Sequence, residues 1–218
     1  MIRLNDKNFY HIDINRTASS SVRDALGLQA VRQHMHPVIK RMKAGENWED
    51  AFVFSVVRNP YDRVVSQWKH RRSYHNGAPF PRWVAANYLD EVHHSGPDKE
   101  YERRLWWPQT KWLSSWQSVE YRAANREFAF GICDFVGRFE SLTGAWDYLR
   151  QQIDFFDDTY GVSFHADKHL PEELPHKGAA GDQRHFTTFY DADTANIIAD
   201  YFYNDFNHFN YDFDSWKQ

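Results

Sequence analysis

The sequence predicts an α/β fold in which helices flank a central parallel sheet, within a single domain that covers residues 1–218. Of the 218 residues, 42% are hydrophobic and 17% aromatic, which is enough to bury one sizeable core. The apolar run Ala51–Val57 is continuous rather than alternating, as in a parallel strand that is buried on both faces. Strand-like and helical segments also alternate along the chain, which is typical of a doubly wound sheet.

The first strand and the first helix follow each other directly. Apolar residues lie among polar ones between Phe9 and Ile14, which is the pattern of a short strand. Val22 and Leu26 then lie one helical turn apart, and the positions between the two patterns, 15–21, are polar except for Ala18. We therefore expect residues 15–21 at a turn from strand to helix.

A second strand and helix follow in the same order. Asn59 and Pro60 end the apolar run, and apolar residues at helical spacing continue to Trp68. The segment Phe128–Phe139 is again strand-like, and Trp146–Ile153 has the spacing of one helix face.

The C-terminal part is expected to be helical. Asp191 has the position of an N-cap before a helix whose apolar face includes Ile198 and Phe202. Residues 72–96 and 163–183 are rich in His, Pro and Gly, so we expect loops or short helices there, outside the sheet.

Charge and cysteine content exclude some classes of protein. The 30 acidic and 26 basic residues give a net charge of −4, which argues against a nucleic-acid-binding surface. Cys133 is the only cysteine, so no internal disulfide can form. The sequence contains no apolar run long enough to cross a membrane and no signal-peptide pattern, so we expect a cytoplasmic protein without a transmembrane segment.

Hydroxyl side chains gather around one arginine at the first strand-to-helix turn, in "NRTASSS" from Asn15 to Ser21. Main-chain N–H groups at a helix start lack intrahelical partners and attract anions, and the hydroxyls and Arg16 add further donors. The alternative is that Ser19 or Ser20 only caps the helix. The stretch contains no glycine, so the phosphate-loop pattern of an ordinary ATP or GTP site is absent.

The second motif, "VRNPYDRVVS" from Val57 to Ser66, follows the second strand. It places Arg58 at the end of the strand and Ser66 on the following helix. One anion can contact both side chains only if Arg58 reaches across the start of that helix.

Together these motifs resemble the sulfotransferases that use 3′-phosphoadenosine-5′-phosphosulfate (PAPS), in particular the branch of carbohydrate O-sulfotransferases. In that family the first loop is similar to I-P-K-T-A-G-T-S and the second to V-R-N-P-x-D-R-x-V-S. Further similarity covers Pro108–Leu113, Asp134–Leu142 and His185–Phe213. The resemblance implies a P-loop-like nucleotide-binding fold, PAPS as the donor, PAP as the product and no metal.

The resemblance also implies roles for individual residues. The first loop would bind the 5′-phosphosulfate, and Arg58 and Ser66 would bind the 3′-phosphate. Phe139 would lie near the adenine unless it belongs to the core, and Arg138 would contact the nucleotide unless it pairs with Glu140. The complete set of nucleotide-binding residues implied is Arg16, Thr17, Ala18, Ser19, Ser20, Ser21, Arg58, Ser66, Arg138, Phe139 and Arg184.

The chain departs from the family at two positions of the first loop. Arg16 stands where the family usually has lysine, and this puts the rate of sulfuryl transfer in question more than binding. Ser19 stands where the family has glycine, which requires a backbone conformation there that a side chain permits.

Transfer also needs a group that accepts the proton of the acceptor hydroxyl. His36 is the expected catalytic base or acceptor-positioning residue, because neutral histidine has a pKa near working pH. His34, Glu49 and Glu140 remain alternatives. Some histidines are spaced as metal ligands, but no Cys or carboxylate completes a metal site.

The acceptor is expected to be a hydroxyl on a carbohydrate or on another small or lipid-linked molecule. Tryptophans such as Trp83, Trp106, Trp107 and Trp112 would offer stacking faces to a sugar, although core packing explains them equally well. Two other functions stay open: a catalytically silent PAP-binding protein, and a phosphotransferase of phosphate-loop type that uses ATP and Mg²⁺.

Overall fold

The computed structural model describes residues 2–4, 7–26, 52–70, 77–89, 106–114, 132–160, 170–175 and 182–218. Their contacts divide the chain into two compact units. The sheet unit comprises Met1–Val57 and Trp112–Gly178, and the helical unit comprises Arg58–Lys111 and Ala179–Gln218. Each unit is described by itself, and the prediction of a single domain stays a prediction.

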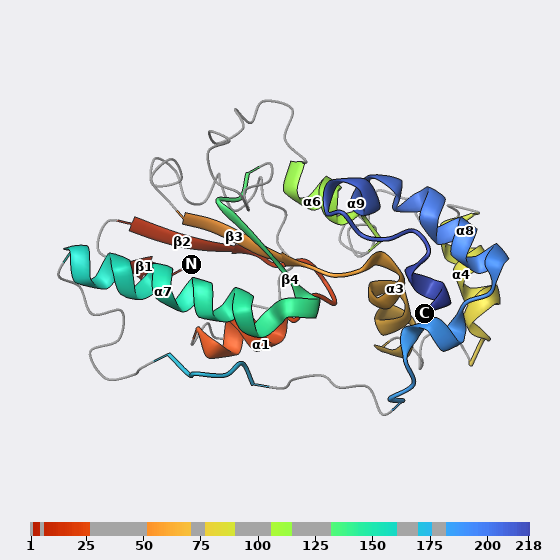
Figure 1. The fold of residues 1–218 in the computed structure, drawn as a ribbon, viewed down its shortest axis with the longest axis horizontal. Helices are drawn as coiled ribbons and strands as arrows, with labels where there is room; N and C mark the ends of the chain where they lie inside the picture. The colour runs from red at the N-terminus through yellow and green to blue at the C-terminus, as the bar shows by residue number, and fades with distance from the viewer. Residues whose placement is uncertain are drawn as a thin grey trace, which may run out of the picture. The chain divides into compact units, whose positions relative to one another are not determined.

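The sheet unit is built on a four-stranded sheet in the order β1-β2-β3-β4 (Figure 1). Strands β2, β3 and β4 are parallel, whereas β1 pairs with β2 in the antiparallel direction. This confirms the predicted α/β class with a parallel sheet, and adds the antiparallel β1, which the sequence pattern did not indicate. The strands are β1 (Ile2–Leu4), β2 (Lys7–Ile12), β3 (Phe52–Val57) and β4 (Phe135–Arg138).

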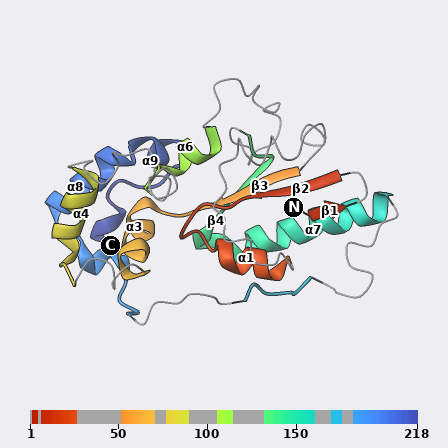
Figure 2. The ribbon, with the colours of Figure 1, turned by 180° about the vertical axis from the view of Figure 1, so that it is seen from behind.

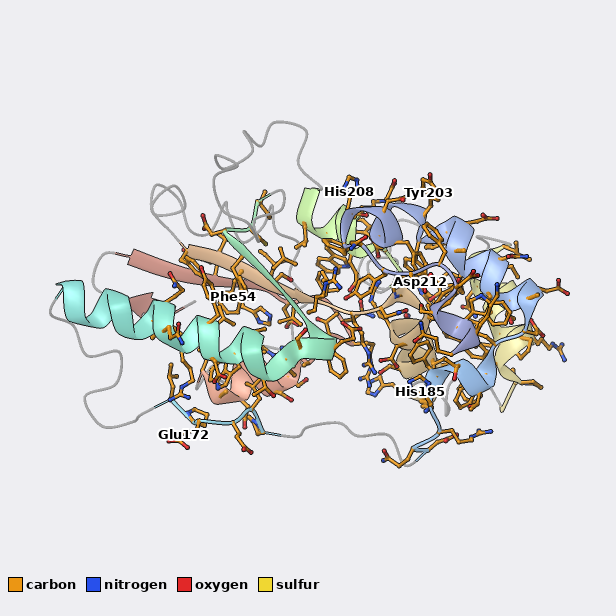
Figure 3. The ribbon with its side chains drawn as sticks, in the orientation of Figure 1. Phe54, Glu172, His185, Tyr203, His208 and Asp212 are labelled. Carbon is orange, nitrogen blue, oxygen red and sulfur yellow. The ribbon has the colours of Figure 1, made fainter. Side chains whose placement is uncertain are left out.

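Strand β3 is buried along its whole length, as its continuous apolar sequence predicts. Phe52, Phe54 and Val56 belong to a core cluster that also contains residues of α1 (Ser19–Ala25) and α7 (Leu142–Tyr160). Both helices cover the same face of the sheet (Figures 1 and 2), and Phe54 lies between the sheet and α7 in Figure 3. The helix predicted from Trp146 to Ile153 lies within α7, and the apolar residues of its predicted face are buried.

Strand β4 is shorter than the predicted segment Phe128–Phe139, because it begins at Phe135. Residues 128–131 lie outside the described part of the chain. At the start of β4, the side chain of Asp134 acts as an extra ladder partner: its Oδ2 accepts from the main-chain N–H of Val53 at 2.8 Å, and its own N–H donates to Val53 O at 2.7 Å.

The helical unit has a core made mostly of aromatic side chains. Trp83, Trp106 and Tyr88 contact one another with ring centroids 5.4 to 6.1 Å apart, and each is buried. Core packing rather than an open stacking face therefore explains Trp83 and Trp106. The elements are α3 (Pro60–His70), α4 (Phe80–Tyr88), the first residues of α6 (Gln109–Ser114), α8 (Ala192–Tyr201), α9 (Tyr203–His208) and the 3₁₀ helices η5 (Phe186–Phe189) and η6 (Ser215–Lys217).

Helix α8 begins as the sequence predicts. The Asp191 carboxylate accepts from Thr194 N at 2.8 Å, and the Thr194 hydroxyl accepts from Asp191 N at 3.1 Å, which completes a capping box. Helix α4 lies inside residues 72–96, where short helices outside the sheet were expected. None of the helices in the described ranges is long and apolar enough to span a membrane.

Gly137 of β4 lets α7 lie close to the sheet. A Cβ atom at Gly137 would lie 2.7 Å from Ala145 Cβ, which is closer than real Cβ atoms approach other atoms, and 3.2 Å from Phe135 Cε1, which is a tight contact. Gly144 precedes Ala145 on α7. A Cβ atom added at Gly144 would meet no atom outside its own helix backbone within 4 Å.

Gly137→Ala is expected to lower the free energy of unfolding by about 1–3 kcal/mol, because overpacking forces the strand and helix apart. Gly144→Ala is the matched control and is expected to raise that free energy by about 0.5 kcal/mol, since alanine favours the helix. Urea denaturation followed by circular dichroism measures both. Equal stabilisation by the two substitutions would contradict the close approach of α7.

Candidate functional site

The predicted first loop follows the carboxyl end of β2. Because β2, β3 and β4 are parallel, with Ile12 opposite Ser55 and Val57 opposite Arg138, their carboxyl ends reach the same edge of the sheet. Ligands of open α/β sheets bind outside this edge. The loop and Arg138 therefore lie at the position that favours a ligand, and Arg58 follows Val57 directly in the chain.

Two residues of the loop have left-handed backbones. Arg16 has φ 67° and Ala18 has φ 64°, a region that residues with a side chain seldom adopt. Ala18 is the N-cap of α1 and forms no side-chain cap bond, so the expected alternative of a serine cap is wrong. Ser19 is the first residue of α1 and has no positive φ, so serine in place of the family's glycine adds no strain at this position.

The hydroxyl side chains of the loop differ in their surroundings. Thr17 is fully buried, and its hydroxyl donates to Ile14 O at 3.0 Å. A hydroxyl has one proton to donate, so the Thr17 side chain closes the turn and does not donate to an anion. Ser19 and Ser21 are also buried, whereas Ser20 is exposed.

An ion pair that sequence reasoning missed ties the loop to α1. Arg23 Nη1 lies 3.0 Å from Asp13 Oδ2, and Asp13 is almost fully buried. Arg23 Nη2 also donates to Ser20 Oγ at 3.4 Å. Asp13 precedes the loop and Arg23 follows it, so the pair fixes both ends of the turn. No local pattern marks this pair, because its members are ten residues apart across a turn.

The second motif begins α3 with a capped turn. The Asn59 side chain accepts from Tyr61 N at 2.9 Å and donates to Ser215 Oγ at 2.9 Å. Pro60 occupies the first helical position, where its missing N–H costs no hydrogen bond. The Asn-Pro pair of the motif therefore starts the helix and ties it to η6.

The Arg58 side chain reaches over the start of α3 to Asp62. Its Nε lies 2.7 Å from Asp62 Oδ2, one helical turn ahead, and its side chain is 15% exposed. Ser66 stands one further turn along α3 and is buried. Arg58, Asp62 and Ser66 thus follow one face of the helix at intervals of four residues.

Arg184 lies in a segment that the last turn of α3 holds. Lys69 Nζ donates to Asp182 O at 3.0 Å and to Arg184 O at 2.9 Å. The Arg184 guanidinium binds the Asp182 carboxylate through Nε and Nη2, the latter at 2.7 Å, and so lowers the pKa of Asp182. Both cations contact the Phe189 ring, with Arg184 Cζ 4.5 Å and Lys69 Nζ 4.8 Å from its centroid.

Lys69 is a residue that the sequence analysis did not select. Burial lowers its pKa most, and the nearby charges of Arg184 and Arg58 lower it further, while Asp182 and Asp62 oppose them. Arg58, Lys69 and Arg184 therefore lie in one charged part of the helical unit, together with Asp62 and Asp182, which pair with the two arginines. Lys69 lies three residues after Ser66 on α3, about one helical turn further on, and this spacing is the sequence signal that could have identified it.

The remaining predicted site residues are Arg138, Phe139 and His36. Arg138 is exposed at the end of β4, and Phe139 is half-buried and packs against the core cluster of the sheet unit. This packing supports the core alternative for Phe139. His36, with His34 and Glu49, lies outside the described residues. Within the described ranges, no group of three or more His, Cys, Asp or Glu residues could hold a metal ion.

The model of the sulfotransferase family matches residues 1–212. No curated protein matches the chain. No solved structure matches it either.

Ala18→Gly is expected to raise the free energy of unfolding by up to about 1 kcal/mol, because glycine adopts the left-handed conformation without strain. Ala25→Gly, at the other end of α1, is the matched control and is expected to lower it by about 0.5 kcal/mol. Chemical denaturation of both variants and of the wild type measures these differences in the free energy of unfolding. If both lower the stability alike, Ala18 does not have a left-handed backbone in solution.

Proposed function

The chain belongs to the sulfotransferase family, and we propose that it transfers the sulfuryl group of PAPS to an acceptor hydroxyl. The observation that carries this proposal is the first loop, which lies at the carboxyl edge of the parallel sheet and turns into α1 with two left-handed residues. Such a turn presents main-chain N–H groups together with Arg16, and both suit an anionic phosphosulfate. PAPS supplies a sulfuryl group on a phosphate leaving group.

For the 3′-phosphate we propose Arg58 and Ser66, with Arg184 as a further contact. The Arg58 guanidinium donates to Asp62 through Nε at 2.7 Å, which holds it over the start of α3, and a planar guanidinium suits the oxygens of a phosphate. Lys69 supports this role, because it adds a positive charge in the part of the helical unit where Asp62 and Asp182 already pair with Arg58 and Arg184.

The proposed acceptor is a hydroxyl of a carbohydrate or of another small or lipid-linked molecule. The proposed base is His36. Arg16 would stabilise the charge that develops on the leaving phosphate, where interactions that strengthen in the transition state accelerate the reaction.

PAP is expected to raise the melting temperature of the protein without added metal. A ligand that binds only the folded state at 100 times its Kd adds about 2.7 kcal/mol of stability. Differential scanning fluorimetry with PAP, and in parallel with ATP and Mg²⁺, measures this. A shift with ATP and Mg²⁺ alone would instead support a phosphotransferase.

Arg16→Ala is expected to lower kcat far more than it weakens PAP binding, by about 100-fold if Arg16 stabilises the leaving phosphate. Arg16→Lys keeps the charge and is the control, with activity retained. The assay follows transfer from labelled PAPS to a panel of saccharides, phenols and glycolipids. Tight PAP binding by a wild-type protein that transfers no label to any acceptor or to water would favour the silent-binder alternative.

A further inference from the structure

The side-chain amide of Gln109 brackets the main chain of Arg58. Arg58 N donates to Gln109 Oε1 at 2.9 Å, and Gln109 Nε2 donates to Arg58 O at 2.8 Å. Both bonds are part-buried, and they join residues 51 positions apart in the sequence. They are the two bonds that a residue of a neighbouring strand would make, so the Gln109 side chain pairs with the main chain of Arg58 as a strand residue would.

The orientation of this amide is determined by Asp205. Asp205 is fully buried, and its Oδ2 accepts from Gln109 N at 2.7 Å and from Gln109 Nε2 at 3.3 Å. A carboxylate offers acceptors to these donors, so Asp205 favours the rotamer in which Nε2 faces it and Oε1 faces Arg58 N. The flipped amide would bring two donors together at Arg58 N.

Asp205 also anchors the start of α6 independently of Arg58. Its Oδ1 accepts from Thr110 N at 2.8 Å and from Thr110 Oγ1 at 2.7 Å. Thr110 therefore shares the helix and the carboxylate with Gln109, but its hydroxyl is bonded to Asp205 rather than to the main chain of Arg58.

We propose that Gln109 is a positioning residue for the 3′-phosphate, which acts by holding the main chain of Arg58 in an orientation that Asp205 maintains. This inference rests on the proposed function of Arg58. With its N–H and C=O both held, the Cα of Arg58 is fixed, and the side chain is directed over the first turn of α3 towards Asp62. Without the amide, the guanidinium must be ordered at the moment the nucleotide binds, and affinity falls by that cost.

The test compares Gln109→Met with Thr110→Val. Each removes hydrogen bonds to the buried carboxylate of Asp205, but only Gln109→Met releases Arg58. The ligands are PAP and adenosine 5′-monophosphate, which lacks the 3′-phosphate, and the readout is the ratio of their Kd values from isothermal titration calorimetry. Arg58→Ala gives the reference for complete loss of the contact.

We expect Gln109→Met to reduce the preference for PAP by about tenfold, in the direction of Arg58→Ala, and Thr110→Val to leave the preference unchanged. Because Gln109→Met removes the partners of buried polar groups at Arg58 and Asp205, Gln109→Asn serves as a second variant, whose amide is one methylene too short to bracket Arg58. An unchanged preference in both Gln109 variants, beside a lost preference in Arg58→Ala, would overturn the inference and leave the proposed function intact.

Amide hydrogen exchange at Arg58 in the ligand-free protein gives a readout that is independent of the nucleotide. The Arg58 N–H is expected to exchange at least about tenfold faster in Gln109→Met than in the wild type, and at the wild-type rate in Thr110→Val. Equal exchange in all three proteins would show that Gln109 does not hold Arg58. A wild-type protein that binds no PAP would overturn the proposed function and the nucleotide role of Gln109 together, whatever the exchange rates.

Discussion

The helical unit depends on one buried carboxylate. Asp205 has no exposed surface, and burial raises its pKa because the charged form loses its hydration. Four hydrogen bonds from the main chains and side chains of Gln109 and Thr110 oppose this cost. Removing them would leave a buried carboxylate without these hydrogen bonds, so the start of α6 and Asp205 of α9 are held together.

A buried arginine complements that carboxylate. Arg63 of α3 is 1% exposed, burial lowers its pKa, and the charge of Asp205 opposes the shift. Its Nη1 donates to Trp107 O at 3.0 Å, and its guanidinium lies 5.7 Å from the centre of the Phe202 ring. The aromatic core of the helical unit thus surrounds charges that are satisfied by hydrogen bonds rather than by water.

The residues of the second motif have two roles, which differ with the face of α3 that they occupy. Some pack the helical unit, and others are the proposed contacts to a ligand. Asn59, Tyr61 and Arg63 bond to η6, to Phe213 O and to Trp107 O, and so serve the packing of the helical unit. Arg58 and Ser66 lie on the face of α3 that carries Asp62. Lys69, in the last turn of the same helix, donates to the main chain of Arg184. One short segment therefore starts a helix, anchors it and presents the proposed phosphate contacts.

The sequence by itself determined the features that arise within a few residues. The continuous apolar run of β3, the cap at Asp191 and the strand-to-helix turn around Arg16 each depend on local spacing, which a sequence displays directly. Only the tertiary structure decided which distant side chains meet. Gln109 and Arg58 are 51 residues apart, Thr110 and Asp205 are 95 apart, and Lys69 meets the main chain of Asp182 across 113 residues. Such pairs have no local signature, because any amide or carboxylate along the chain carries the same chemistry until folding removes water from around one of them.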